Sequence, residues 1–266
     1  MKVGKIVSLI LILSLLASAL FSCAKSPEKL TGKADAVLAK KTHVIEVDVD
    51  YTVESTAVSG IFDQLERREV KLLVDGDKVA IDDRMSISYS GGDREFVNTY
   101  IIIGGIVYMD MRYTSKEGSN STKGKSEISN ADALSLKEKA SVIGGIGIDD
   151  FASSETLKRD GDRVILSTGA GEELKARLEK IMISELSDTA EKVGVKDARL
   201  TIELDGKKYD TVTLICDYEI TMSGLTYTVR AEYELEYDYD ERVDITAPQN
   251  PSEYSEMELD IILGTI

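Results

Sequence analysis

Apolar and polar residues alternate along most of this chain, which predicts β-strands that are buried on one side. The longest such run spans residues 225–239, where apolar side chains hold the odd positions and mostly acids and threonines hold the even ones. Residues 212–222 alternate in the same way, and a shorter run covers 200–204. Pairing these strands wrongly by one residue would bury the acids, so their register is strongly specified.

The first half of the chain shows the same period of two. We expect a strand at 44–53, a hairpin over 70–81, a further strand at 85–89 and a hairpin over 97–113. The hairpin over 70–81 turns at an Asp-Gly pair, which supplies the positive φ angles of a tight turn. Together these runs predict a meander of five or six antiparallel strands.

Three segments instead repeat their apolar residues at helical spacing. They are residues 30–41, 131–140 and 172–186, and the last has the clearest apolar stripe together with two glutamates that suit the helix dipole. Between the helical segments, residues 156–167 predict one more short hairpin.

Two connecting segments do not follow either period. Residues 114–130 are almost wholly polar and rich in Ser, Gly and Lys, which predicts an exposed, mobile loop. Residues 142–148 contain three glycines among apolar residues, and their conformation stays open.

The first 23 residues have the layout of a secretory signal, with Lys2 and Lys5 followed by an uncharged apolar run. Leu20, Ser22 and Cys23 resemble the lipobox of bacterial lipoproteins. This resemblance implies cleavage before Cys23, attachment of a diacylglyceryl group to its sulfur, and a stable anchor in a membrane. The alternative is an uncleaved membrane anchor with an incidental cysteine.

Charge and cysteine content narrow the function classes further. The formal net charge of −16 argues against nucleic-acid binding, which needs a basic surface, and against peripheral binding to anionic lipid headgroups. Once Cys23 is lipidated, Cys216 is the only other cysteine, so an intramolecular disulfide is excluded. No second apolar run is long enough to span a bilayer.

Few residues carry the chemistry of an active site. His43 is the only histidine and is expected on the surface; neither an orienting partner for a general base nor a set of zinc ligands is evident. Cys216 is expected to pack as a small buried hydrophobe. Nucleotide-binding and serine-hydrolase motifs are absent. We therefore predict no catalytic residue, no metal site and no cofactor, and expect that the protein is not an enzyme.

Three sets of residues have two possible roles each. Alternate acids could bind a cation, but along a strand they form a ladder rather than a cage, so a solvated face is expected: Glu232, Glu234, Glu236, Asp238 and Asp240. Four tyrosines could line a ligand groove or form plain core: Tyr227, Tyr233, Tyr237 and Tyr239. Four methionines lie on apolar faces, where core is again the expectation: Met109, Met111, Met182 and Met222.

The order of elements resembles that of the LolA-like and LppX-like lipoproteins, with a lipobox, an N-terminal helix, a meander, central helices and a second long-stranded meander. The closing pattern Val243-x-Ile245-x-x-Pro248 and the segment Ile106–Met109 after a Gly-Gly turn are also similar to that group. The resemblance implies an α+β fold in which a strongly curved antiparallel sheet, a half-barrel, carries helices on its concave face. It also implies space for acyl chains between sheet and helices.

From this resemblance we expect four regions. They are a signal peptide at 1–22, a lipidated N-terminus and tether at 23–32, the half-barrel at 33–248 and a C-terminal tail at 249–266. The apolar lining of a ligand site is expected between the sheet and the helix at 172–186. Its candidate residues are Leu174, Leu178, Ile181, Met182, Tyr227, Val229, Tyr233 and Tyr237.

The leading functional hypothesis is an extracytoplasmic protein, anchored through Cys23, that binds or carries an acyl chain or other hydrophobic ligand. In an envelope with a single membrane, the anchor would lie in the outer face of the cytoplasmic membrane. The alternative is a non-catalytic envelope protein with a solid core, whose acidic face binds a partner protein. A hydrolase is a distant third possibility.

Overall fold

The computed structural model describes residues 27–53, 67–87, 92–140, 156–186 and 190–264. The expected signal peptide, the lipidation site at Cys23 and the glycine-rich segment 142–148 lie outside the described residues and stay predictions.

Twelve described strands form one sheet. They are β1 (His43–Val53), β2 (Arg67–Asp75), β3 (Lys78–Ile87), β4 (Arg94–Ile103), β5 (Ile106–Ser115), β6 (Gly118–Glu127), β7 (Thr156–Asp160), β8 (Arg163–Gly169), β9 (Lys192–Asp205), β10 (Lys208–Met222), β11 (Leu225–Asp238) and β12 (Ser255–Glu256). The helices are α2 (Pro27–Leu38), α3 (Asn130–Ala140), α4 (Glu172–Glu185) and α5 (Leu259–Leu263), with a short 3₁₀ turn, η2, at Pro251–Glu253. Among the described residues, no helix is both long and apolar enough to cross a bilayer.

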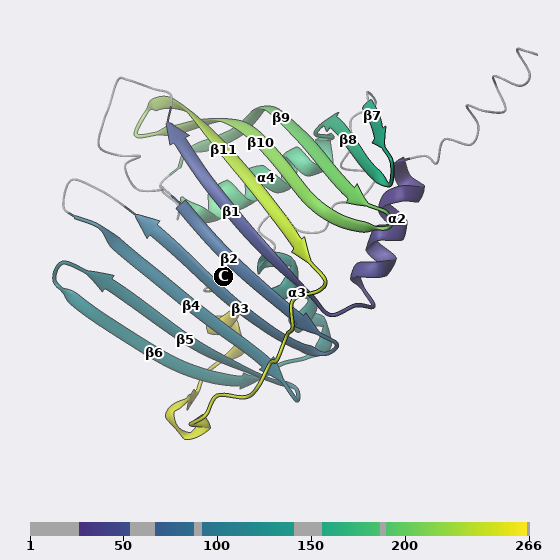
Figure 1. The fold of residues 1–266 in the computed structure, drawn as a ribbon. Helices are drawn as coiled ribbons and strands as arrows, with labels where there is room; N and C mark the ends of the chain where they lie inside the picture. Colours follow the sequence, from purple (N-terminus) through teal and green to yellow (C-terminus); the bar gives the residue numbers. More distant parts are fainter. Residues whose placement is uncertain (1–26, 54–66, 88–91, 141–155, 187–189, 265–266) are drawn as a thin grey trace, which may run out of the picture.

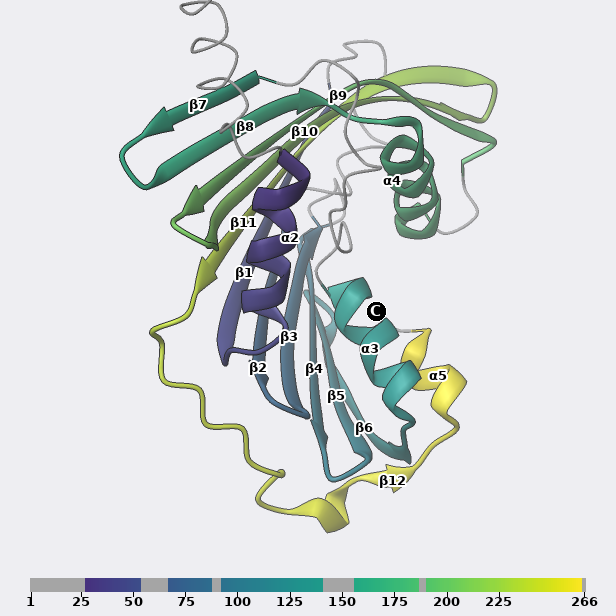
Figure 2. The same cartoon turned by 90° about the vertical axis from the view of Figure 1, so that its right-hand side faces the viewer.

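The strands follow the order β12-β6-β5-β4-β3-β2-β1-β11-β10-β9-β8-β7 across the sheet. All neighbouring pairs are antiparallel except β12 with β6. The sheet is large, curved and open, and α2, α3, α4 and α5 lie on its concave side (Figures 1 and 2). The predicted α+β half-barrel is therefore confirmed.

Strand alternation places the main core on the concave side. Ile45 of β1, Ile81 of β3, Tyr100 of β4 and Leu214 of β10 all belong to it. The helices cover different strands: α2 packs on β10, α4 on β9, α3 on β2 and β3, and α5 on β6. The predicted helices and the hairpins over 70–81, 97–113 and 156–167 are all present.

The prediction of an exposed, mobile loop at 114–130 is wrong, because β6 pairs with β5 along its full length within this segment. Residues 118–122 are exposed although they are hydrogen-bonded in a strand. Outside Gly124 and Lys125, which pair with the two-residue β12, β6 lies at the edge of the sheet. Such a strand can be stabilised by its backbone hydrogen bonds without an apolar face, so its sequence lacks the alternation of the other strands.

The C-terminal segment, residues 239–264, returns to the sheet after β11. It crosses the convex side and passes around the β6 edge to the concave side, where α5 lies beside α3 (Figures 1 and 2). The backbone N–H of Met257 donates to the Lys125 carbonyl at 3.0 Å, and the Met257 side chain lies against Gly124. Ile262 is fully buried, so this segment belongs to the packed body of the protein.

Candidate functional site

The eight predicted lining residues all lie on α4 or on the concave side of β11. Six of them are buried members of the main core: Leu174, Leu178, Met182, Tyr227, Val229 and Tyr233. Ile181 and Tyr237 are half-buried. A side chain beside a cavity large enough for water keeps some accessible surface, so the fully buried members are packed by protein atoms here.

Three tyrosine hydroxyls in this part of the core form hydrogen bonds with other side chains. The hydroxyls of Tyr218 and Tyr233 lie 3.0 Å apart, and Tyr209 donates to Asp35 Oδ1 at 2.6 Å. Burial raises the pKa of Tyr209 and Tyr218 well above the ordinary value. Cys216 is buried beside Tyr218, as predicted, and burial raises the pKa of its thiol to about 12. These groups are neutral and suited to packing rather than to nucleophilic chemistry.

The prediction that His43 lies on the surface is wrong, because its side chain is buried at the start of β1 and is only 5% exposed. Its Nδ1 lies 2.8 Å from the carbonyl oxygen of Lys41, so Nδ1 carries the proton. Its ring is 6.1 Å from that of Tyr239. Burial lowers the pKa of His43, the bond to Lys41 opposes this shift, and the Lys137 ammonium lowers the pKa further.

A different part of the concave face is only half-buried. Directly paired positions on β3, β4 and β5 carry Met85, Phe96 and Tyr113, and the next row carries Met111. The rings of Phe96 and Tyr113 are 5.0 Å apart. One row further along the same strands, Tyr100 and its neighbours are fully buried. The concave face therefore has one closed end and one half-exposed apolar end on β3–β5.

A buried ion pair borders this half-exposed end. Arg68 of β2 donates from Nε to Asp83 Oδ1 and from Nη2 to Oδ2, both at 2.9 Å. The two side chains are 9% and 6% exposed. Asp83 of β3 lies directly opposite Asn98 of β4, and Arg68 lies opposite Met85.

Sequence reasoning missed both features, although one signal was available. Arg68 is in phase with the apolar positions of β2, and Asp83 is in phase with those of β3. Opposite charges at core positions of the two strands of one hairpin indicate a buried ion pair. The half-exposure of Phe96 and Met111 has no such signal, because it depends on where the helices end.

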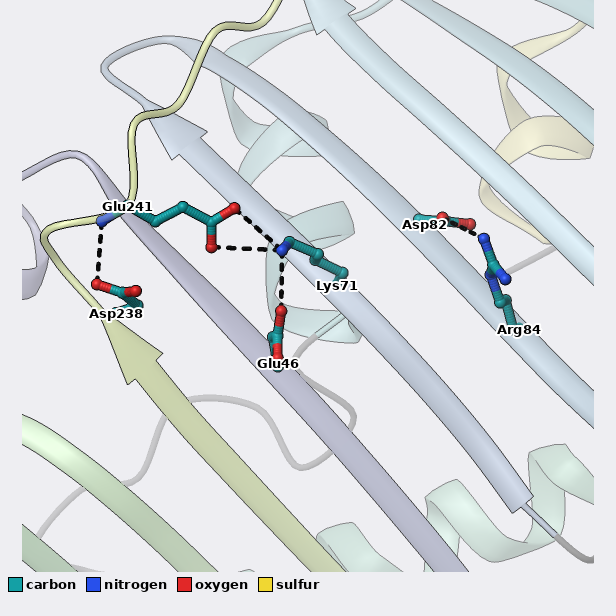
Figure 3. Close-up of polar contacts among 6 residues, drawn as sticks. All are labelled: Glu46, Lys71, Asp82, Arg84, Asp238 and Glu241. Atoms are coloured by element: carbon teal, nitrogen blue, oxygen red, sulfur yellow. Dashed lines mark hydrogen bonds and ion pairs between the residues drawn. The ribbon is translucent and has the colours of Figure 1, made fainter.

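The convex face is polar and acidic, as predicted for the even positions of β11. Three acid pairs lie directly opposite one another on β1 and β11: Glu46 and Glu236, Asp48 and Glu234, Asp50 and Glu232. Figure 3 shows Lys71 at the margin, 2.9 Å from Glu46 and 3.1 Å from Glu241. Asp238 accepts from the Glu241 backbone N–H at 3.0 Å.

The convex face of the neighbouring strands also carries ion pairs. Arg84 lies 3.2 Å from Asp82 on β3 (Figure 3). Among the described residues, no group of His, Cys, Asp and Glu side chains is arranged to hold a metal ion.

No protein-family model matches the chain, and no curated protein matches it. Among solved structures it is similar to Rv2717c from M. tuberculosis, with 10% identity and a TM-score of 0.22 over 77% of this chain and 97% of that chain. It is also similar to an N-terminal dehydratase from the difficidin assembly line, with 8% identity and a TM-score of 0.19 over 82% and 83% of the two chains. MucB in complex with MucA(peri) gives 8% identity and a TM-score of 0.13 over 82% and 100%. At these TM-scores the similarities support no conclusion about function, and the resemblance to LolA-like lipoproteins stays a prediction.

Proposed function

We propose that this protein is an extracytoplasmic, lipid-anchored binding protein that holds an acyl chain or other apolar ligand against the concave face of its sheet. The observation that carries the proposal is the half-exposed apolar end on β3–β5. Ligand sites are concave, mostly apolar and provided with a few polar groups. Phe96, Met111 and Tyr113 supply such a surface next to the polar pair of Arg68 and Asp83.

The direct test is retained lipid. Residues 24–266 are expressed without the signal, and the folded protein is studied by native mass spectrometry before and after organic extraction. We expect a bound mass that extracts as lipid, or uptake of an added apolar dye. Absence of both would reject the binding proposal.

A matched pair of variants locates the binding. Phe96 and Val97 are adjacent on β4, both half-buried, and face opposite sides of the sheet. Phe96→Asp should lower dye or lipid uptake by tenfold or more, whereas Val97→Asp should leave it near the wild-type level. Equal loss in both variants would indicate general destabilisation instead of a concave site.

The anchor is a separate part of the proposal. We expect that cells fed an alkyne-labelled fatty acid label the wild-type protein, and that Cys23→Ser abolishes the label while the protein still accumulates. Labelled Cys23→Ser protein would contradict attachment at that residue.

The second candidate function is an envelope interaction protein with an acidic partner-binding face. The three directly opposed acid pairs favour it. One acid of each pair forms a salt bridge within the sheet (Glu46 with Lys71, Asp48 with Arg67 and Glu232 with Arg230), and a basic partner would neutralise the acid opposite it. Charge reversal at Glu232, Glu234 and Glu236 should then abolish recovery of a partner from envelopes. A variant that recovers the same partner would exclude this function for the acidic face.

We also infer that the protein is not an enzyme. The only histidine, His43, is buried and only 5% exposed, so its ring is shielded from a substrate in solution. Ester, peptide and glycoside substrates should show no turnover. Turnover that disappears in a single acidic or His43 variant would overturn this inference.

A further inference from the structure

The outer edge of β6 is only partly paired. On one side β6 pairs with β5 along its full length in a continuous register, whereas on the other side only Gly124 and Lys125 pair, with the two-residue β12. Among the described strands, no other strand lies on that outer side. Residues 118–122, which precede the paired positions, are exposed. This part of the sheet therefore ends in an edge to which one more strand can be added.

The contacts of β12 identify the backbone groups that face this open edge. The backbone N–H of Met257 donates to the Lys125 carbonyl at 3.0 Å, so the backbone groups of Lys125 point away from β5. In a strand, the N–H and C=O of one residue point to the same side, and that side alternates from residue to residue. Because the register of β6 is continuous, the backbone groups of Ser119 and Ser121 also point to the open edge.

The C-terminal segment of this chain pairs with only a small part of the edge. In the parallel register of β12, residues 249–254 would lie opposite residues 118–123. This stretch contains Pro251, which has no backbone N–H, and it forms the 3₁₀ turn η2 instead of a strand. The open part of the edge is thus left to a segment that can stay extended.

The convex side of the edge is basic, although the formal net charge of the chain is −16. The ammonium group of Lys123 lies 2.7 Å from Glu253, and that of Lys125 lies 3.1 Å from Glu256. Lysines on an edge strand commonly keep other strands away. Here each lysine instead binds an acid of the segment beside it, so the edge complements an acidic strand.

The concave side of the same edge favours apolar residues. Gly124 lies directly opposite the core residue Met109, and the Met257 side chain lies against Gly124. Next along β6 on this side, Thr122 lies opposite Met111 of the half-exposed end. An apolar residue on the concave side of an added strand would extend this apolar surface by one strand.

We propose that the β6 edge binds an extended segment of a partner protein in which acidic residues alternate with apolar ones. Its backbone pairs with Ser119 and Ser121, and its acids bind Lys123 and Lys125 in place of the acids of the C-terminal segment. In such strand addition the backbone hydrogen bonds give affinity and the alternate side chains give specificity. The C-terminal segment is a replaceable competitor, because exposed ion pairs contribute little to stability.

The test uses residues 24–266 and two fluorescein-labelled peptides of about ten residues, one of alternating Val and Glu and one of alternating Val and Lys. Fluorescence anisotropy measures their binding. We expect the acidic peptide to bind about tenfold or more tightly than the basic one, because the basic peptide meets like charges on β6. Equal binding of the two peptides would overturn the inference.

A matched pair of variants tests the backbone pairing. Ser121→Pro removes an N–H at the open edge but none that pairs with β5, so the fold should persist. It should weaken binding of the acidic peptide about tenfold or more, whereas Ser121→Ala should leave binding near the wild-type level. Unchanged binding by a folded Ser121→Pro variant would exclude strand addition at this edge.

Charge variants test the side chains and the competitor without proline. Lys123→Glu with Lys125→Glu should reverse the preference between the two peptides. Glu253→Gln with Glu256→Gln weakens the competing segment and should bind the acidic peptide more tightly than the wild type. A preserved preference in the first variant, or no binding of the acidic peptide to the second, would overturn the inference.

Discussion

The two halves of the concave face differ in how completely they are closed. On β9–β11, α2 and α4 cover the sheet, and Tyr218, Tyr233 and Leu214 are fully buried. On β3–β5, one end is equally closed, but the other carries the half-buried Phe96 and Met111. The same alternating pattern therefore produces core in one half and an accessible apolar surface in the other, and the position of the covering elements decides which.

Breaking the ion pair between Arg68 and Asp83 should give the largest loss of stability of the changes considered. Asp83→Leu leaves Arg68 buried without its carboxylate, and we expect a loss of about 3–5 kcal/mol in the free energy of unfolding. The double variant Arg68→Met with Asp83→Leu should lie near the wild type, because it removes both charges. Urea denaturation of the three proteins measures the difference. Equal destabilisation of the single and double variants would mean that packing, not charge, dominates there.

Truncation of one side chain in each half measures the contrast directly. Leu178→Ala in the closed half should cost about 2–5 kcal/mol, because it leaves a cavity in a packed core. Met111→Ala in the half-exposed end should cost clearly less, since solvent already reaches the side chain. The two midpoints and slopes in urea provide the comparison. A similar cost at both positions would remove the distinction between the halves.

A smaller change in β6 tests how the C-terminal segment packs against that strand, beside the β3–β5 half. A Cβ on Gly124 would lie 2.8 Å from Met257 Cε and 2.9 Å from its Sδ, so Gly124→Ala must displace that flexible side chain. We expect destabilisation of about 1 kcal/mol, as for mild overpacking, and faster hydrogen exchange of the Met257 amide. Gly194→Ala is the control, because its Cβ would meet only Glu179 Oε1 at 4.0 Å. Unchanged exchange at Met257 would show that the segment stays in place.

Most of the strands could be predicted from the sequence, because their apolar and polar residues alternate strongly and their hairpin turns contain glycine. It failed at β6, whose polar residues are held by backbone pairing at the sheet edge, and at His43, whose burial depends on how α3 and the end of β11 pack around it. The ligand site that the sequence places under α4 stays a prediction, and its residues Leu174 and Leu178 are buried in the structure. Chemistry alone does not reveal exposure, which results from the three-dimensional placement of the covering segments.

His43 makes the stability of the protein depend on pH. Its pKa in the folded protein is lowered from 6.5, chiefly by burial, so the unfolded chain binds a proton more readily. Stability should therefore be constant above about pH 7 and fall as the pH drops through 6.5, the unfolded value. The measurement is thermal or urea unfolding between pH 5 and 8. His43→Asn should lose this dependence, and an equally pH-dependent variant would assign the effect to the carboxylates instead.

Thiol modification compares the accessibility of the two halves in the native protein and is expected to disturb the structure least. Residues 24–266 contain one cysteine, Cys216, which is buried in the closed half with a thiol pKa of about 12. Because the thiolate is the reactive form, a chromogenic disulfide reagent should modify Cys216 only after unfolding. In a Cys216→Ala background, Met111→Cys should react within minutes in the folded protein, since that position is half-exposed. A bound ligand on β3–β5 should then protect position 111, so the same reagent reports occupancy of the half-exposed end while Cys216 in the wild type reports only opening of the core.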